Sequence, residues 1–240
     1  MRRLLGALRR ADERFHLIEE GDKIAVGLSG GKDSMALLYA LTLYKRFSKK
    51  EYDLHGICVD LGFEGFAAQT VADYADSLSV PVDVLKTDIG EVVFDIRKEK
   101  NPCSLCAKMR KGALYEQAVK RGCNKAAFAH HVDDALQTFI MSMMYEARLF
   151  TLQPKTFLSR TGVTLIRPLI LAREYDVKGA VARNNIPFFK NPCPADEHTV
   201  REQSKDVVRY INSLHEGAME NMINALSNTA NYNLWDKADE

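Results

Sequence analysis

The sequence predicts an α/β fold: a Rossmann-like parallel sheet of about five strands with helices on both faces, followed by a helical C-terminal extension. Two observations support this fold class. Short apolar runs alternate with helix-length segments through residues 21–150. The chain of 240 residues, 46% hydrophobic and 27% charged, is also long enough to bury the core of such a domain.

The first elements follow from local patterns. Residues 2–19 carry apolar side chains spaced among charges, which predicts an amphipathic helix. Ile24–Leu28 is a short apolar run bounded by Asp22 and Ser29, as a buried strand would be. Asp33–Phe47 contains neither glycine nor proline and predicts a helix.

The same alternation continues along the chain. The next predicted elements are a strand at Leu54–Val59, a helix at Gly65–Leu78, a strand at Val82–Leu85, a helix at Cys103–Arg121, a strand at Ala126–Ala129 and a helix at Val132–Tyr145. Residues 150–170 predict a loop or hairpin, and 173–227 are mainly helical with an interruption at IPFFKNPCPAD. This order predicts three segments: an N-terminal helix (1–20), an α/β domain (21–172) and a helical region (173–240).

Charge and hydropathy limit the classes of function. The chain carries 33 Lys and Arg against 32 Asp and Glu, so its net charge neither supports nor excludes nucleic-acid binding. The longest apolar run, Met35–Tyr44, is too short to span a bilayer, and the apolar stretch in MRRLLGALRR is too short for a signal peptide. We expect a cytoplasmic protein with no membrane partner.

The five cysteines raise the question of metal or redox chemistry. An odd number, in a chain without a secretion signal, argues against a disulfide framework. Cys58 lies in a predicted buried strand and Cys123 in a helix-to-strand turn, where we expect both to be core residues. Cys103 and Cys106 have C-x-x-C spacing at a helix start, which suits a metal, a cluster or a redox disulfide; two unrelated buried thiols are the alternative.

The stretch SGGKDS, residues 29–34, joins a predicted strand to a predicted helix. Backbone N–H groups and the positive end of a helix dipole meet there, and they stabilise an anion. The glycine pair permits close approach, while Ser29, Lys32 and Ser34 can donate hydrogen bonds to phosphate oxygens. A plain turn with Asp33 as helix N-cap is the alternative. The spacing differs from the Walker pattern, which has an earlier glycine.

The stretch FAHHVDDALQTFIMSMMY also places polar residues where a strand meets a helix. Its two histidines and two aspartates together predict a site at the carboxyl edge of the sheet, although a lone histidine is more often structural. These residues are His130, His131, Asp133 and Asp134.

These stretches resemble a known family. SGGKDS is similar to the SGGxDS loop of adenylating PP-loop ATPases, and PCSLCAKMRKGAL, AHHVDDALQTFIMSMMY and IRPLILAREYDV resemble blocks of the tRNA 2-thiocytidine synthetase branch of tRNA-thiolating enzymes. The resemblance implies the PP-loop fold, ATP with Mg²⁺, a [4Fe-4S] cluster on three cysteines, and thiolation at C2 of a pyrimidine in tRNA. It also implies a sulfur donor such as a cysteine desulfurase or free sulfide.

The resemblance assigns roles to single residues. It implies that ATP is bound by Ser29, Gly30, Gly31, Lys32, Asp33, Ser34, His130 and Asp133. It implies that the catalytic residues are Asp33, Asp134 and Arg110, and that the cluster ligands are Cys103, Cys106 and Cys193. Cys193 stands between two prolines, which fix a loop that can present a thiolate. It departs from the family pattern in having no C-x-x-C partner.

Two other functions stay open. One is a PP-loop sulfurtransferase or amidotransfer-type enzyme that acts on a small molecule. The other is a zinc-stabilised nucleotide-binding protein without thiolation activity, in which His198 joins the three cysteines. A homodimer is left open. We expect any RNA to bind through basic residues of two patches: Arg2, Arg3, Arg9 and Arg10, and Lys45, Arg46, Lys49 and Lys50.

Overall fold

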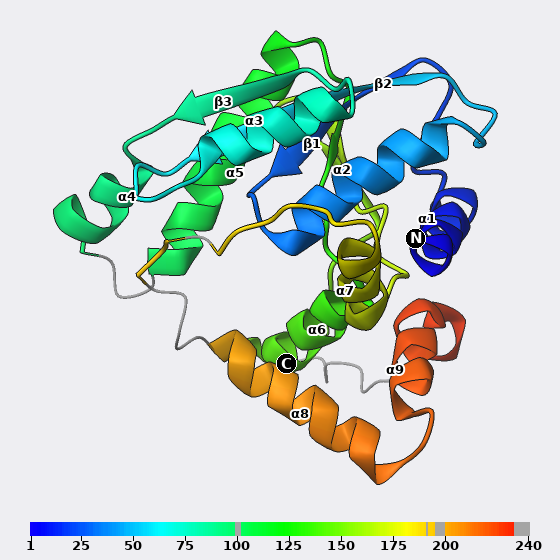
Figure 1. Cartoon of the computed structure of the whole chain (residues 1–240). Helices are drawn as coiled ribbons and strands as arrows, with labels where there is room; N and C mark the ends of the chain where they lie inside the picture. The colour runs from blue at the N-terminus through cyan, green and yellow to red at the C-terminus, as the bar shows by residue number, and fades with distance from the viewer. Residues whose placement is uncertain (99–101, 191, 195–199, 233–240) are drawn as a thin grey trace. The chain divides into compact units, whose positions relative to one another are not determined.

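The structure is a computed structural model that describes residues 1–98, 102–190, 192–194 and 200–232 (Figure 1). The chain forms two compact units, each described here by itself. The first comprises residues 1–132 and 153–197, and the second comprises 133–152 and 198–240. The division into segments 1–20, 21–172 and 173–240 stays a prediction.

A six-stranded sheet in the order β3-β2-β1-β4-β6-β5 forms the centre of the first unit. Neighbouring strands are parallel except β5 and β6, which form an antiparallel hairpin. The predicted fold class is confirmed, and the sheet exceeds about five strands because the hairpin at 150–170 adds two. The strands are β1 (Asp22–Leu28), β2 (Tyr52–Asp60), β3 (Val82–Lys86), β4 (Lys125–Ala127), β5 (Lys155–Leu158) and β6 (Val163–Ile166).

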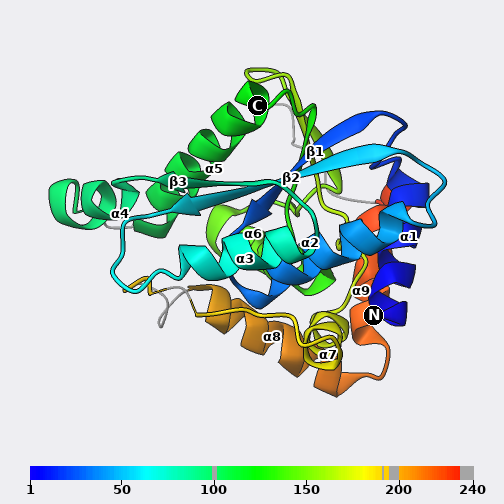
Figure 2. The same cartoon turned by 45° about the horizontal axis from the view of Figure 1, so that its top comes forward.

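Helices cover both faces of this sheet (Figure 2). From β1 to β3 the chain steps in one direction, so right-handed crossovers put α2 (Lys32–Lys45) and α3 (Ala68–Ser77) on one face. The return from β3 to β4, beyond β1, puts α5 (Pro102–Lys120) on the other. Ahead of α5, a turn of helix α4 (Ile89–Glu91) runs into a π-helix, η1 (Val92–Ile96); both are too short to show a period in the sequence.

Two further helices pack near α2. Helix α1 (Arg2–Phe15) contacts both α2 and α7 (Glu174–Arg183). The predicted helix at 2–19 is too long, because His16 takes a left-handed backbone conformation (φ 49°) and ends it. Leu17 and Ile18 are buried beyond that end, which explains why they continue the apolar pattern.

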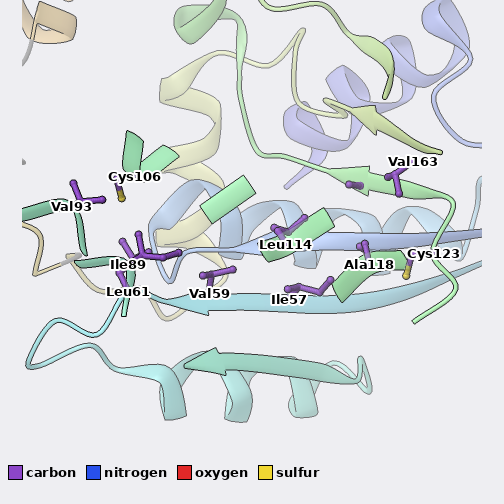
Figure 3. Close-up of a cluster of buried hydrophobic side chains, with 12 residues drawn as sticks. Ile57, Val59, Leu61, Ile89, Val93, Cys106, Leu114, Ala118, Cys123 and Val163 are labelled. Atoms are coloured by element: carbon purple, nitrogen blue, oxygen red, sulfur yellow. The ribbon is translucent and has the colours of Figure 1, made fainter. Parts of the chain in front are cut away.

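The core beneath α5 contains two of the cysteines (Figure 3). Ile57 of β2 and Leu114 of α5 belong to one buried cluster that also includes Cys106 and Cys123. Cys106 lies near the start of α5 and Cys123 beyond its end, so roughly 20 Å of helix separates them. The burial of Cys58 and Cys123 confirms that both are core residues.

The second unit is helical. It contains α6 (Val132–Glu146) from Asp133 onward, α8 (Val200–Leu214), α9 (Ala218–Ser227) and a 3-10 turn, η2 (Thr229–Asn231). Leu136 and Ile140 of α6 form a buried cluster with Val208 of α8 and Met219 of α9. Among the described helices of the chain, none combines the length and the apolar character that a membrane crossing requires.

Candidate functional site

The SGGKDS loop leaves the carboxyl end of β1 and enters α2. Gly31 is the N-cap and Lys32 the first helical residue, and the loop is held by its own serines. The Ser34 hydroxyl donates to the Gly31 carbonyl (2.9 Å) and accepts from the Ser29 amide (3.2 Å). Gly30 has φ +76°, a left-handed conformation that glycine adopts without strain. The loop therefore presents the first-turn amides of α2 at the edge of the sheet, as an anion site requires.

Asp33 does not cap this helix. The N-cap interpretation is wrong because the helix starts one residue earlier, which puts Asp33 in its first turn. The Asp33 carboxylate instead accepts two hydrogen bonds from Lys32 Nζ, at 2.9 and 3.0 Å. Lys32 also pairs with Glu174 at the start of α7 (3.4 Å). Burial lowers the pKa of Lys32, but these two carboxylates outweigh burial and raise it above its ordinary value.

His131 lies at the same point. Its ring is buried, and Nε2 is 4.0 Å from Asp33 Oδ1. Sequence reasoning noticed His131 in the His-His pair but assigned the site role to His130. Glu174 was missed, because nothing in its local sequence indicates a partner as distant as Lys32.

A segment from the end of the first unit crosses the loop. The Phe189 amide donates to the Gly30 carbonyl (3.0 Å), and its ring makes an edge contact with Phe66 (5.3 Å between centroids). A Cβ on Gly30 would lie only 2.1 Å from Phe189 Cζ, so the ring occupies the space that glycine leaves. The sequence predicted an interruption of helix here, but not this contact.

Three cysteines and Arg110 come together at the start of α5. Cys103 is exposed, Cys106 buried and Cys193 half-buried. Burial raises the pKa of the Cys106 thiol, Arg110 acts in the opposite direction, and the nearby thiols of Cys193 and Cys103 raise it further. Each of these groups thus lies close enough to Cys106 to alter its ionisation.

The donor set suits a thiolate-bound metal or cluster. Thiolates are the form in which cysteines bind metals and clusters, so a cation would favour ionisation of the Cys106 thiol against the effect of its burial. As they stand, the described residues contain no group of three His, Cys, Asp or Glu side chains arranged to hold a metal ion. His198, the fourth ligand of the zinc alternative, lies outside the described residues.

His130 follows the end of β4 and contacts a residue that sequence reasoning missed. Arg167, the first residue after β6, donates from Nε to His130 Nδ1 (3.3 Å) and from Nη1 to the Gln153 carbonyl. Because Nδ1 accepts, the proton of the neutral imidazole is on Nε2. The Arg167 side chain is buried, and burial lowers its pKa. The family resemblance includes Arg167 in the block IRPLILAREYDV and assigns it no role.

Asp133 and Asp134 lie in the first turn of α6, in the second unit. The dipole of a helix favours negatively charged side chains in its first turn. Ionised carboxylates are the ligands that Mg²⁺ prefers. The structure thus makes this pair chemically suited to the role that the sequence predicted.

The chain matches known proteins over nearly its whole length. Residues 7–212 match the PP-loop domain family. A tRNA-cytidine(32) 2-sulfurtransferase of Pelobacter propionicus is 32% identical, over 98% of this chain and 89% of the relative. Another from Verminephrobacter eiseniae is 35% identical, over 98% of this chain and 75% of the relative. Among solved structures, the U34-tRNA thiolase NcsA from Methanococcus maripaludis with its [4Fe-4S] cluster has a TM-score of 0.76 at 20% identity, over 93% of this chain and 77% of that one.

Proposed function

This chain belongs to the PP-loop domain family and, within it, to the tRNA-cytidine(32) 2-sulfurtransferases, and from that premise we propose that it is an ATP-dependent enzyme that thiolates cytidine in tRNA. The observation that carries the proposal is the presence, in one compact unit, of the SGGKDS loop and of Cys106 with two further thiols, Cys103 and Cys193, close enough to affect its pKa. The loop suits the activation of an oxygen, and the thiols suit the delivery of sulfur.

The loop binds the polyphosphate of ATP. Backbone amides at Gly30, Gly31 and the start of α2 hold the pyrophosphate that leaves when the C2 oxygen of cytidine attacks the α-phosphate. The C2–O–AMP group is then attacked by a sulfur nucleophile. The C2–S bond forms, the C2–O bond breaks, and AMP departs with the oxygen.

Lys32 and Asp33 are the charged residues of the loop that act on the phosphates in this step. Lys32 lies between the carboxylates of Asp33 and Glu174, so it is held protonated beside the loop and can neutralise a phosphate oxygen. We propose Asp33 as a ligand of Mg²⁺, since the ion prefers oxygen ligands and bridges phosphates. Within the second unit, Asp133 and Asp134 are proposed as carboxylate ligands of the same chemical kind. His130 and Ser29 complete the nucleotide-binding set, and Asp134 additionally assists proton transfer.

Cys103, Cys106 and Cys193 would hold a [4Fe-4S] cluster, with Arg110 stabilising the thiolate of Cys106. When bound, such a cluster supplies an iron without a protein ligand, at which sulfur can be held. Two parts of the protein position these cysteines. Phe189 holds the segment that precedes Cys193 against the ATP loop, and α5 carries the C-x-x-C pair.

Transfer RNA would bind along α1. Arg2, Arg3, Arg9 and Arg10 are all exposed, and they line a surface hollow of about 1310 Å³ together with Phe47 and Tyr175. Cations beside exposed aromatic rings suit a nucleic-acid backbone with unstacked bases. Lys50, of the second basic patch, instead forms an ion pair with buried Asp12 (2.7 Å).

We further propose a cytoplasmic location and a cysteine desulfurase or free sulfide as the sulfur donor. Sedimentation measurements would show whether the protein forms a homodimer.

The test is a reconstituted reaction. Anaerobically prepared holoenzyme, ATP, Mg²⁺, sulfide and tRNA should yield AMP and 2-thiocytidine, detected by mass spectrometry of the tRNA nucleosides. Formation of AMP without 2-thiocytidine, with thiolation of a free pyrimidine nucleoside instead, would favour the small-molecule alternative.

A cysteine series tests the cluster separately. Cys103→Ala, Cys106→Ala and Cys193→Ala should each lose the brown colour and the iron, whereas Cys58→Ala and Cys123→Ala should retain both, since these two thiols are buried in the core. Stoichiometric zinc in colourless wild-type protein would contradict the assignment.

A further inference from the structure

Arg167 is a buried cation that the described fold leaves without an acidic partner. Its residue surface is 7% exposed, and no carboxylate of the described ranges forms an ion pair with its guanidinium. Its two hydrogen bonds go to neutral acceptors, His130 Nδ1 and the Gln153 carbonyl. Burying a charge without a counter-charge destabilises a fold by several kcal/mol. A group retained in this state is suited to an anion that arrives from outside the chain.

The place of Arg167 in the sheet indicates which anion. Ile166, the last residue of β6, pairs with Ala127 of β4, so Arg167 lies at the carboxyl edge where ligands bind to such sheets. β6 is two strands away from β1, which corresponds to about 10 Å at the usual spacing of strands. The loop after β1 already supplies the amides and the lysine for the phosphates of ATP. At this distance from the loop, Arg167 is suited to a second anion.

The neighbours of Arg167 suit a nucleotide. The Tyr115 phenol is close enough to influence the Arg167 guanidinium, and its ring makes an edge contact with Phe128 (6.1 Å). Phe128 in turn lies 6.0 Å from the His130 ring. Tyr115 and Phe128 are half-buried and pack on the core beneath α5, so they form a wall beside the guanidinium. Proteins that bind single-stranded RNA combine such cations, which contact phosphates, with neighbouring aromatic rings.

We propose that Arg167, oriented by His130, binds a backbone phosphate of the RNA substrate beside the nucleotide to be thiolated. This inference rests on the proposed function, because it assumes an RNA substrate. It adds a specific phosphate contact at the reacting end of the sheet, separate from the arginines of α1.

The experiment compares Arg167→Gln with a matched control. Arg160→Gln removes the same charge from the exposed β5–β6 turn. Holoenzyme of each variant is titrated with unmodified tRNA at several salt concentrations by filter binding, and with ATP by calorimetry. Arg167→Lys is included because it keeps the charge but loses the guanidinium fork, and it retains the fold if Arg167→Gln does not.

We expect Arg167→Gln to weaken tRNA binding and to make the slope of log K against log salt shallower by about 0.7–0.9, the value for one phosphate contact. ATP affinity should be unchanged, Arg160→Gln should match the wild type, and Arg167→Lys should keep the wild-type slope with lower affinity. An unchanged slope in Arg167→Gln, or a loss of ATP affinity instead, would overturn this inference alone. Wild-type protein that binds no tRNA at any salt would overturn the proposed function with it.

Discussion

The two edges of the sheet differ in how their charged side chains are paired. At the amino edge, charged side chains find partners within the chain: Asp22 of β1 and Lys125 of β4 are both buried and lie 2.7 Å apart, and Asp83 of β3 is bound by Arg121. At the carboxyl edge, Lys32 pairs with Asp33 and Glu174 beside the loop, but Arg167 has only neutral partners among the described residues, and Gly30 occupies a conformation that few other residues tolerate. The amino edge stabilises the fold by itself, whereas the carboxyl edge is arranged for ligands.

The comparison predicts different results for glycines at the two ends of β1. Gly21 and Gly30 both have positive φ, +78° and +76°, so alanine costs about 1–2 kcal/mol of backbone free energy at either position. Only at Gly30 does the new Cβ meet Phe189; at Gly21 nothing lies within 4 Å. Gly30→Ala must therefore also displace Phe189 or the loop. We expect a loss of roughly 100-fold in ATP-dependent AMP formation, typical of misplaced reacting groups.

Thermal unfolding and single-turnover AMP formation would measure both effects. Gly21→Ala serves as the control, with a similar loss of stability and an unchanged rate. Equal rates in the two variants would show that the contact between Phe189 and Gly30 does not position the ATP loop.

The next effect is on stability and lies at the amino edge. Asp12 is buried and accepts hydrogen bonds from the Ile18 amide (2.8 Å), the Tyr44 hydroxyl (2.8 Å) and Lys50 Nζ (2.7 Å). Asp12→Ala removes the carboxylate that these donors share, leaving Lys50 Nζ with the Ile18 carbonyl alone, and should lower the free energy of unfolding by about 3 kcal/mol. Glu13→Ala, at the exposed neighbouring position, should lower it by no more than about 0.5 kcal/mol. Denaturant titration would measure both losses of stability. Similar midpoints for the two variants would contradict the interpretation that paired charges at the amino edge stabilise the fold.

The sequence predicted the ATP loop well because that loop is local. Strand, glycine pair and helix are contiguous between residues 22 and 45, and their pattern reports their structure directly. The error at Asp33 is also local: Gly31 takes the extended backbone of an N-cap, and Lys32 then competes for the carboxylate. A one-residue shift of the helix start was enough to change the role of the side chain.

The residues that were missed depend on tertiary structure. In the sequence Arg167 resembles an ordinary residue at a strand end; that its hydrogen-bond partners among the described residues are the neutral groups of His130 and Gln153 depends on the tertiary structure. Phe189 is one of two adjacent phenylalanines, and the sequence does not show that Phe188 is exposed while Phe189 covers Gly30. The assignment of Cys193 to the cluster came from the family resemblance and stays a prediction.

A smaller, pH-dependent effect is expected at Asp83. Hydrogen bonds from Arg121 hold the pKa of the Asp83 carboxyl below its ordinary value, with Gln117 and His55 adding to them. A lowered pKa in the folded state stabilises the protein above the unfolded pKa of about 4, and this stability is lost as the pH falls towards the folded value. Asp83→Asn should therefore lower stability by about 2 kcal/mol near neutral pH.

The difference between Asp83→Asn and wild type should shrink below about pH 4, where the Asp83 carboxyl of the unfolded wild type takes up a proton while the folded one is still ionised. Asp53→Asn, at a carboxylate whose side chain is 70% exposed, is the control and should change little at any pH. A stability gap for Asp83→Asn that is constant from pH 7 to pH 3 would show that the charge of Asp83 is not what the amino edge uses.

The smallest effect concerns the thiols of the carboxyl edge. Arg110 lowers the pKa of Cys106 against the larger effect of burial, so Arg110→Ala should raise that pKa further and reduce the thiolate fraction. Alkylation of Cys106 in the metal-free protein, followed by peptide mass spectrometry, should slow a few-fold at pH 8, and its midpoint should move to higher pH.

The control is Lys108→Ala. It removes a charge from an exposed position on the same helix, and Lys108 is not one of the groups that alter the pKa of Cys106. If Lys108→Ala slowed the reaction as much as Arg110→Ala, general helix charge rather than a specific contact would set the reactivity of Cys106. A slower reaction in Arg110→Ala alone would mean that a single cation at this edge prepares the Cys106 thiol for its ligand.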